Sequence, residues 1–179
     1  MPNLKAISLS VSAVVVLICL AMAFSNPSLA HYRQTILTSV AEQEASHEAQ
    51  VERDAIEKEA TALKSYFSAA HYDGSQLDAV TIQRRFPKLG RSIVGQHTPV
   101  STSLNERLGH IKEQALQRVT VTHETVLYSL KADLAGHSMR ESYGLWSYFS
   151  TCHNNRLLTY LGVAGQFHEE ESGTCVSSR

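Results

Sequence analysis

Residues 143–168 read YGLWSYFSTCHNNRLLTYLGVAGQFH, a stretch rich in aromatic and β-branched side chains. Such residues favour strands, and the pattern predicts one strand over Tyr143–Thr151 and a second over Arg156–His168. Between the two strands stand Asn154 and Asn155. Asparagine tolerates the positive φ that tight hairpin turns demand. The stretch therefore predicts a C-terminal β-hairpin.

Two glycines lie inside the second predicted strand. Gly162 and Gly165 indicate a bulge or a close approach of another backbone. We expect the apolar residues of this strand to share one face: Leu157, Leu161, Val163 and Phe167. A lone hairpin is marginally stable in water, so helices earlier in the chain must cover its apolar face. The predicted fold class is α+β, with helices packed on a small antiparallel sheet.

A long helix is predicted over residues 25–70, because neither Gly nor Pro occurs from Leu29 to Ala70. Asn26 suits the N-cap of this helix and Pro27 its first helical position. Apolar residues recur at helical spacing in two groups: Leu29, Tyr32, Ile36 and Val40, then Ile56, Ala60, Leu63 and Phe67. The apolar stripe between the groups is thin, so we interpret the segment as an exposed helix that is open to self-pairing.

A second helix begins at a capping box formed by Ser103 and Glu106 and continues to Arg118. Residues 119–134 fit a strand or a helix, and we favour a helix that ends at Ala135 with Gly136 as its C-cap. Four segments follow from these patterns: an N-terminal apolar segment (1–24), the long helix (25–70), a loop-rich basic connector (71–102) and a C-terminal α+β domain (103–179).

The N-terminal segment has no charged residue from Ala6 to Phe24. A helix of this length rises roughly 28 Å, close to the hydrocarbon thickness of about 30 Å. Lys5 precedes it, so the positive-inside rule places the short tail in the cytoplasm and the rest of the chain outside. We therefore expect the membrane to be a partner through residues 6–24.

Two interpretations of this segment remain open. An uncleaved anchor, which we favour, gives a single span in a bacterial inner membrane with an extracytoplasmic C-terminal domain. A cleaved signal peptide gives a periplasmic or secreted protein, because Ala21–Ala23 and Ser28–Ala30 both have the small-x-small pattern of a cleavage site. Both interpretations send the remaining chain to an extracytoplasmic space.

This location determines how the three cysteines are interpreted. Cys19 lies in the apolar segment and acts there as a small hydrophobic residue. Cys152 and Cys175 would be the thiols of an oxidising space, so we predict a disulfide between them. The alternative is a pair of unpaired cysteines, with Cys175 in a frayed terminus.

The charge balance disfavours a nucleic-acid binder, because 16 Lys and Arg face 17 Asp and Glu. A local basic cluster stands out within the connector: Arg84, Arg85, Lys88 and Arg91. It is a candidate contact for anionic lipid headgroups, polysaccharide or an acidic partner, and ordinary surface charge is the alternative. For the protein as a whole, we expect the partner to be another envelope protein or a second copy of this chain.

No chemical motif points to catalysis. The nine histidines lack the spacing of metal ligands on one helix, although the fold could assemble a site from His137, His153 and His168. We predict no catalytic residue, no metal and no cofactor. Three aromatic residues could form a stacking platform for a sugar or peptide, or could instead fill a small core: Trp146, Tyr148 and Tyr160.

Three segments together resemble a family of small bacterial membrane-anchored proteins known only as a domain of unknown function. The segments are Asn26-Pro27-Ser28 with Tyr32, Arg140 with Tyr143-Gly144-Leu145-Trp146-Ser147-Tyr148, and Gly162-Val163-Ala164-Gly165-Gln166-Phe167. The resemblance covers about a third of the chain. It implies an envelope location and carries no catalytic residue.

The sequence thus predicts a non-enzymatic envelope protein, tethered through its first helix, with a protein-binding or structural role. The alternative is a secreted ligand-binding module or enzyme with a site near His153, His168 and the aromatic strand.

Overall fold

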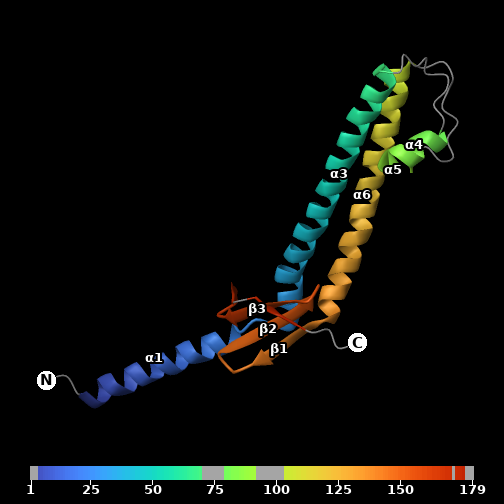
Figure 1. The fold of residues 1–179 in the computed structure, drawn as a ribbon. Helices are drawn as coiled ribbons and strands as arrows, with labels where there is room; N and C mark the ends of the chain where they lie inside the picture. Colours follow the sequence, from blue (N-terminus) through green and yellow to red (C-terminus); the bar gives the residue numbers. More distant parts are fainter. Residues whose placement is uncertain (1–3, 70–78, 92–102, 171, 176–179) are drawn as a thin grey trace. The chain divides into compact units, whose positions relative to one another are not determined.

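The computed structural model describes residues 4–69, 79–91, 103–170 and 172–175, and its chain forms two compact units (Figure 1). Unit 1 combines Met1–Ala41 with Ser129–Arg179, and unit 2 is Glu42–Tyr128. The segment predicted as the C-terminal domain, 103–179, contributes to both units.

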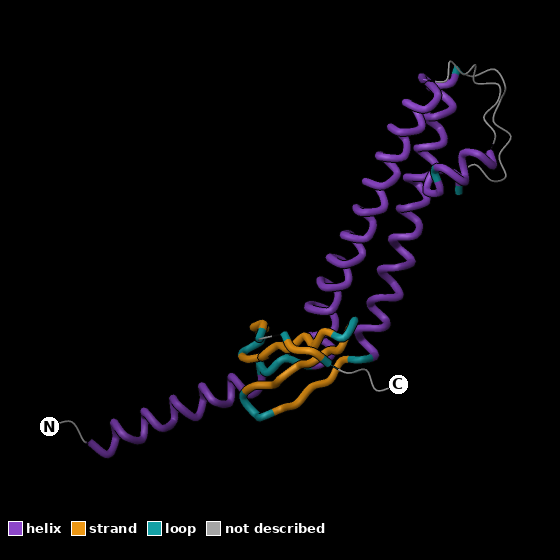
Figure 2. Tube along the Cα trace, viewed as in Figure 1, coloured by secondary structure: helices purple, strands orange, loops and turns teal. Residues whose placement is uncertain are grey.

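Unit 1 contains a five-stranded antiparallel sheet (Figure 2). Its strands are β1 (Ser138–Ser142), β2 (Trp146–His153), β3 (Arg156–Val163), β4 (Gln166–Glu169) and β5 (Gly173–Thr174). The order is β1-β2-β3-β4, and β5 pairs with the first residues of β3. The α+β class is therefore confirmed, and β2 and β3 form the C-terminal hairpin. Strand β1 was not expected from the sequence.

The turn of this hairpin has the predicted chemistry. Asn154 and Asn155 adopt φ values of 50° and 61°, the left-handed conformation that a tight turn requires. The predicted second strand is too long, however, because Ala164 and Gly165 form another such turn at φ values of 50° and 79°. Phe167 therefore returns on β4 opposite Gly162, on the other face from Leu157, Leu161 and Val163.

The core of unit 1 is built around Tyr32, which is fully buried at the end of α2 (Leu29–Tyr32). Its ring stacks on Phe149 with centroids 4.9 Å apart and lies 5.7 Å from both Tyr160 and Phe167. A Cβ added at Gly162 would lie only 2.6 Å from Phe149 Cε2. The close neighbour of Gly162 is therefore a side chain and not the backbone predicted from the sequence, and the missing Cβ leaves the space that the Phe149 ring fills.

The Tyr32 hydroxyl makes unit 1 sensitive to alkaline pH. Burial raises the pKa of Tyr32 to about 12, although its hydrogen bond with Thr151 acts in the opposite direction. The pKa is higher in the folded than in the unfolded chain, so the stabilisation is complete below pH 10 and disappears as the pH rises towards 12. We expect urea unfolding followed by Trp146 fluorescence to show a loss of about 2 kcal/mol over this range. Tyr32→Phe should lose less, and an equal loss would contradict this origin.

A π-helical segment changes the helix register after Tyr32. η1 (Arg33–Leu37) follows α2 directly and continues into α3 (Thr38–Ala69). A π turn inserts one residue into an α-helix, so the buried side chains are Tyr32, Leu37 and Ala41. The predicted stripe through Ile36 and Val40 is therefore wrong beyond Tyr32, and both of these residues are only half-buried.

Asn26 has a different role from the predicted N-cap. Ser28 caps α2 by accepting a hydrogen bond from His31 N. The Asn26 side chain instead donates to Gly144 O at 2.9 Å and accepts from Ser147 Oγ at 3.0 Å. Arg140 Nε also donates to Ser147 Oγ, at 3.1 Å. The first and second segments of the family resemblance are thereby joined in unit 1.

Helix α1 (Leu4–Phe24) precedes these residues. Large apolar side chains of α1 are exposed around the helix: Val14, Val15, Val16, Leu17, Ile18, Leu20 and Phe24. Among the described residues, no single helix combines the length and apolar character of a membrane span, whereas Ser12–Phe24 and Leu29–Ser68, bent by 58°, meet both criteria together. Cys19 is exposed on α1 and is not disulfide-bonded.

Unit 2 is a helical hairpin formed by most of α3 and of α6 (Leu104–Gly136), apart from the ends that belong to unit 1. The two helices run side by side, and the short helices α4 (Ala79–Arg85) and α5 (Pro87–Gly90) pack against them (Figure 1). Its buried core comes from all four helices: Ala49, Ile56, Leu63, Phe67, Ile82, Leu89, Ile111, Ala115 and Val119. The predicted exposed helix therefore packs within its own chain. Of the connector (71–102), the structure describes residues 79–91, and these form α4 and α5; the remainder lies outside the described residues.

The N-terminus of α6 has the predicted capping box. Ser103 N donates to Glu106 Oε2 at 2.9 Å, and Glu106 N donates to Ser103 Oγ at 3.4 Å. The helix continues without a break through residues 119–134, as favoured from the sequence, and includes Gly136 as its last residue. Gly136 is thus helical and lies before the cap.

Candidate functional site

A pocket of about 240 Å³ lies on the helical hairpin of unit 2. Its lining comes from α3, α6 and the α5 corner: Ala45, Glu48, Ala49, Glu52, Ile56, Lys88, Arg91, Ala115, Arg118, Val119, Thr122, His123 and Val126. Small apolar side chains form its floor, and charged or polar side chains form its rim. We call it the hairpin pocket. An apolar hollow with a few polar groups at its edge is the usual form of a binding site.

The α5 corner of the pocket is held in place by Glu59 on α3. Glu59 Oε2 accepts hydrogen bonds from Lys88 N at 2.9 Å and from Leu89 N at 3.0 Å. These amides belong to the first turn of α5, where amides lack partners within the helix and favour an anion. Gly90 packs so closely on the Gln83 backbone of α4 that a Cβ would overlap it. The corner is therefore fixed from two sides.

Replacing Glu59 by glutamine is expected to loosen this corner by about 1–2 kcal/mol, because a charged acceptor of two amides becomes a neutral one. The exchange of the Lys88 and Leu89 amides with deuterium should become roughly tenfold faster in NMR spectra, which corresponds to about 1.4 kcal/mol. Glu57→Gln is the matched control, since Glu57 pairs with Lys112 at 2.7 Å on the surface. Equal acceleration in both variants would contradict the role of Glu59.

The structure divides the four basic residues predicted as an anionic-partner contact. Arg85 places its guanidinium 4.9 Å from the centre of the Tyr66 ring, and Lys88 forms an ion pair with Glu52. Arg84 is exposed on α4 away from the pocket lining. Arg91 lines the hairpin pocket. Two of the four positive charges are thus engaged within the chain.

Arg118 joins Arg91 at the pocket, although no pattern in the sequence pointed to it. Arg118 Nη2 donates to Arg91 O at 2.6 Å, and Arg91 Nε donates to Pro87 O at 3.4 Å. Within the described part of the chain, neither guanidinium has a carboxylate at ion-pair distance. An arginine has five N–H donors, so both retain donors for an anionic group at the rim. Arg118 has no local motif that marks it as a site residue, because only the pairing of α3 with α6 and α5 brings it beside Arg91.

The predicted aromatic platform is divided between the two faces of the sheet. Trp146 and Tyr148 share one face of β2. Tyr160 pairs with Phe149 and lies 5.7 Å from Tyr32, on the buried face. The third ring beside Trp146 and Tyr148 is that of Tyr143 and not that of Tyr160. Its centroid lies 6.4 Å from the Trp146 ring and 6.0 Å from the Tyr148 ring.

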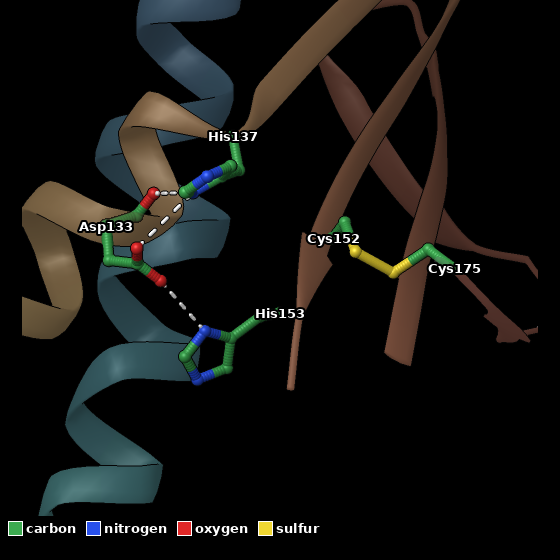
Figure 3. Close-up of a disulfide and its surroundings, with 5 residues drawn as sticks. All are labelled: Asp133, His137, Cys152, His153 and Cys175. Atoms are coloured by element: carbon green, nitrogen blue, oxygen red, sulfur yellow. Dashed lines mark hydrogen bonds and ion pairs between the residues drawn. A yellow bond between two sulfur atoms is a disulfide. The ribbon is translucent and has the colours of Figure 1, made fainter. Parts of the chain in front are cut away.

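A disulfide joins Cys152 on β2 to Cys175 just after β5, and a histidine pair lies beside it (Figure 3). Asp133 Oδ2 is 3.1 Å from His153 Nδ1, and Asp133 Oδ1 is 3.3 Å from His137 Nδ1. His168 lies on β4 opposite Leu161 and does not join them. Among the described residues, no three His, Cys, Asp or Glu side chains are arranged to hold a metal ion.

Comparison of the chain with protein-family models, with curated proteins and with solved structures finds no match. The hairpin pocket is therefore interpreted from its own geometry. A small apolar floor beside two guanidinium groups fits an acidic group flanked by small apolar side chains.

Proposed function

We propose that this chain is a membrane-tethered extracytoplasmic protein that binds another envelope protein at the hairpin pocket. The main support for the membrane tether is the exposed apolar surface of α1. The side chains of residues 14–18 are 53–65% exposed, and Phe24 is 88% exposed. A helix that is apolar all round requires an apolar environment. The absence of charge from Ala6 to Phe24 supports a membrane as that environment.

The disulfide between Cys152 and Cys175 supports the location. Such bonds persist in oxidising compartments such as the periplasm and are rare in the cytosol. The contacts of unit 1 also bear on signal cleavage. Cleavage after Ala30 would remove Asn26, which is hydrogen-bonded to Gly144 and Ser147. An anchored chain, or one cleaved after Ala23, keeps these contacts.

The proposed role in binding is supported by the rim of the hairpin pocket. Arg91 and Arg118 can each donate paired N–H groups to a carboxylate, and such charge-assisted pairs are among the strong hydrogen bonds. The pocket floor of Ala45, Ala49 and Ala115 suits small apolar side chains. The partner is thus a protein segment with an acidic residue beside small apolar ones.

A topology assay tests the tether. Alkaline phosphatase fused after Arg179 should be active in intact cells, and the fusion should resist extraction by alkaline carbonate. Mass spectrometry of the N-terminus separates the two forms, because a cleaved protein would begin after Ala23 and would wash off the membrane. The proposal would be overturned if alkaline phosphatase were inactive at this position and a reporter that works only in the cytosol were active there.

Crosslinking in intact cells tests the pocket. A photoreactive residue at Thr122, which lines the pocket, should give a defined adduct, whereas the same residue at Thr125 on the same helix should not. Arg118→Glu should reduce the adduct at least tenfold, and Arg84→Glu, outside the pocket, should leave it unchanged. Adducts of equal yield at Thr122 and Thr125 would refute binding at this pocket.

A further inference from the structure

An exposed aromatic cluster lies on the outer face of the sheet in unit 1. It consists of Tyr143, Trp146 and Tyr148, whose exposed fractions are 54%, 41% and 40%. The Tyr143 ring stacks on Trp146 and meets Tyr148 edge to face. Large aromatic side chains that remain half exposed and contact one another form a surface that is suited to an apolar or amphipathic partner.

The strand register explains why Trp146 and Tyr148 face outward. Ser147 and Phe149, which alternate with Trp146 and Tyr148 on β2, are fully buried on the opposite face. Across β3, Trp146 pairs with Val163 and Tyr148 pairs with Leu161. On the outer face, the aliphatic side chains of Val163 and Leu161 therefore lie next to the aromatic cluster. On β1 the same face carries Met139, which is 65% exposed.

The cluster is attached directly to the end of α1. Asn26, two residues after the helix ends, donates through Nδ2 to Gly144 O at 2.9 Å and accepts from Ser147 Oγ. Gly144 lies between β1 and β2 with φ of 79°, beside Tyr143. These hydrogen bonds hold the turn that carries Tyr143, and the start of β2 that carries Trp146, next to the end of the exposed apolar helix.

We propose that the cluster of Tyr143, Trp146 and Tyr148 lies in the headgroup region of the bilayer that holds α1. This inference rests on the proposed tether. Tryptophan and tyrosine prefer the membrane–water interface, because their rings are apolar and their N–H or O–H groups remain hydrated. A single helix alone leaves the attached domain free to tilt. Rings seated beside the helix end give the sheet a second point of attachment.

The charges on this face select the lipid. Among the described residues on the outer face of β1, β2 and β3, there is no Lys or Arg, and Glu141 accepts a hydrogen bond from the Tyr143 hydroxyl at 3.0 Å. Attraction to anionic headgroups therefore has no basis on this face. The contact is with the interface of zwitterionic lipid, and it should be insensitive to salt.

Trp146 gives a site-specific test, because the chain contains one tryptophan. The full chain is reconstituted in phosphatidylcholine vesicles that contain lipid brominated near the headgroup or near the end of the acyl chain. Flotation is measured in the same samples. We expect Trp146 emission to shift to shorter wavelength, and shallow bromine to quench it at least twofold more than deep bromine does. Half-molar salt should leave the quenching unchanged.

A matched variant moves the probe along the same face. Trp146→Phe combined with Thr159→Trp places the tryptophan on β3, opposite Ser150 of β2. Ser150 lies about 13 Å from Trp146 along β2. Shallow quenching should fall at least twofold in this variant. Equal quenching at both positions, or no quenching of Trp146 in a chain that floats with the vesicles, would overturn the inference and leave the tether intact. A chain that does not float would overturn the tether itself.

Discussion

Replacing Tyr32 by alanine is expected to lower the free energy of unfolding of unit 1 by about 3–5 kcal/mol. The side chain is fully buried and contacts three other aromatic rings, so its removal leaves a cavity that the sheet cannot close. The Thr151 hydroxyl, 3.2 Å from the Tyr32 hydroxyl, would also lose this partner inside the core. Urea unfolding of the full chain in mild detergent, followed by Trp146 fluorescence, measures this loss, because the only tryptophan lies in unit 1.

Tyr128→Ala is the matched control for this change. Tyr128 is 79% exposed on α6, and a surface substitution of this kind usually changes stability by less than about 0.5 kcal/mol. Tyr32→Phe separates the ring from the hydroxyl, and we expect it to cost about 1 kcal/mol. If Tyr32→Ala unfolded at the same urea concentration as Tyr128→Ala, the aromatic cluster would not be the core of unit 1.

Short-range signals in the sequence predicted several elements correctly. The pair Asn154-Asn155 and the capping box of Ser103 and Glu106 depend on residues that are adjacent or one turn apart, so a single sequence contains the necessary information. The second turn at Ala164 and Gly165 was missed. An alanine in the left-handed region is uncommon, and the apolar pattern on both sides of the turn resembles a single continuous strand.

The helix register after Tyr32 could not be predicted from spacing alone. A regular helix would bury Ile36 and Val40 with Tyr32, but the π segment shifts the buried positions to Leu37 and Ala41. Asn26 shows the same limit, because its hydrogen-bond partners are Gly144 and Ser147, more than a hundred residues away. Contacts between distant segments have no local signature.

The hairpin pocket was hidden from the sequence for a related reason. Half of its apolar lining residues are alanines, which fit an exposed helix as well as a close helix pair, so the pairing of α3 with α6 was not predicted. The basic residues of the connector were predicted as a contact for a partner, but Arg85 contacts Tyr66 and Lys88 pairs with Glu52 within unit 2. The structure adds Arg118, which is distant in sequence from Arg91, so only the fold brings these two arginines to one rim, which also carries Glu48 and Glu52.

Reduction of the disulfide between Cys152 and Cys175 is expected to lower the stability of unit 1 by about 3 kcal/mol. The two cysteines are 23 positions apart, so the bond restricts a sizeable loop of the unfolded chain. It also holds β5, whose two residues pair only with Arg156 and Leu157 among the described residues. Urea unfolding with and without dithiothreitol measures the change through Trp146 fluorescence.

The double variant Cys152→Ser with Cys175→Ser separates the bond from other effects of the reductant. It should unfold like the reduced chain and should not respond to dithiothreitol, because the remaining Cys19 is unpaired. Cys19→Ser should keep the full response. Since β1 to β4 form most of the sheet and β5 is short, the reduced chain should still fold and keep the blue-shifted emission of Trp146 in vesicles. A reductant effect of equal size in the double variant would contradict a stabilising bond between Cys152 and Cys175.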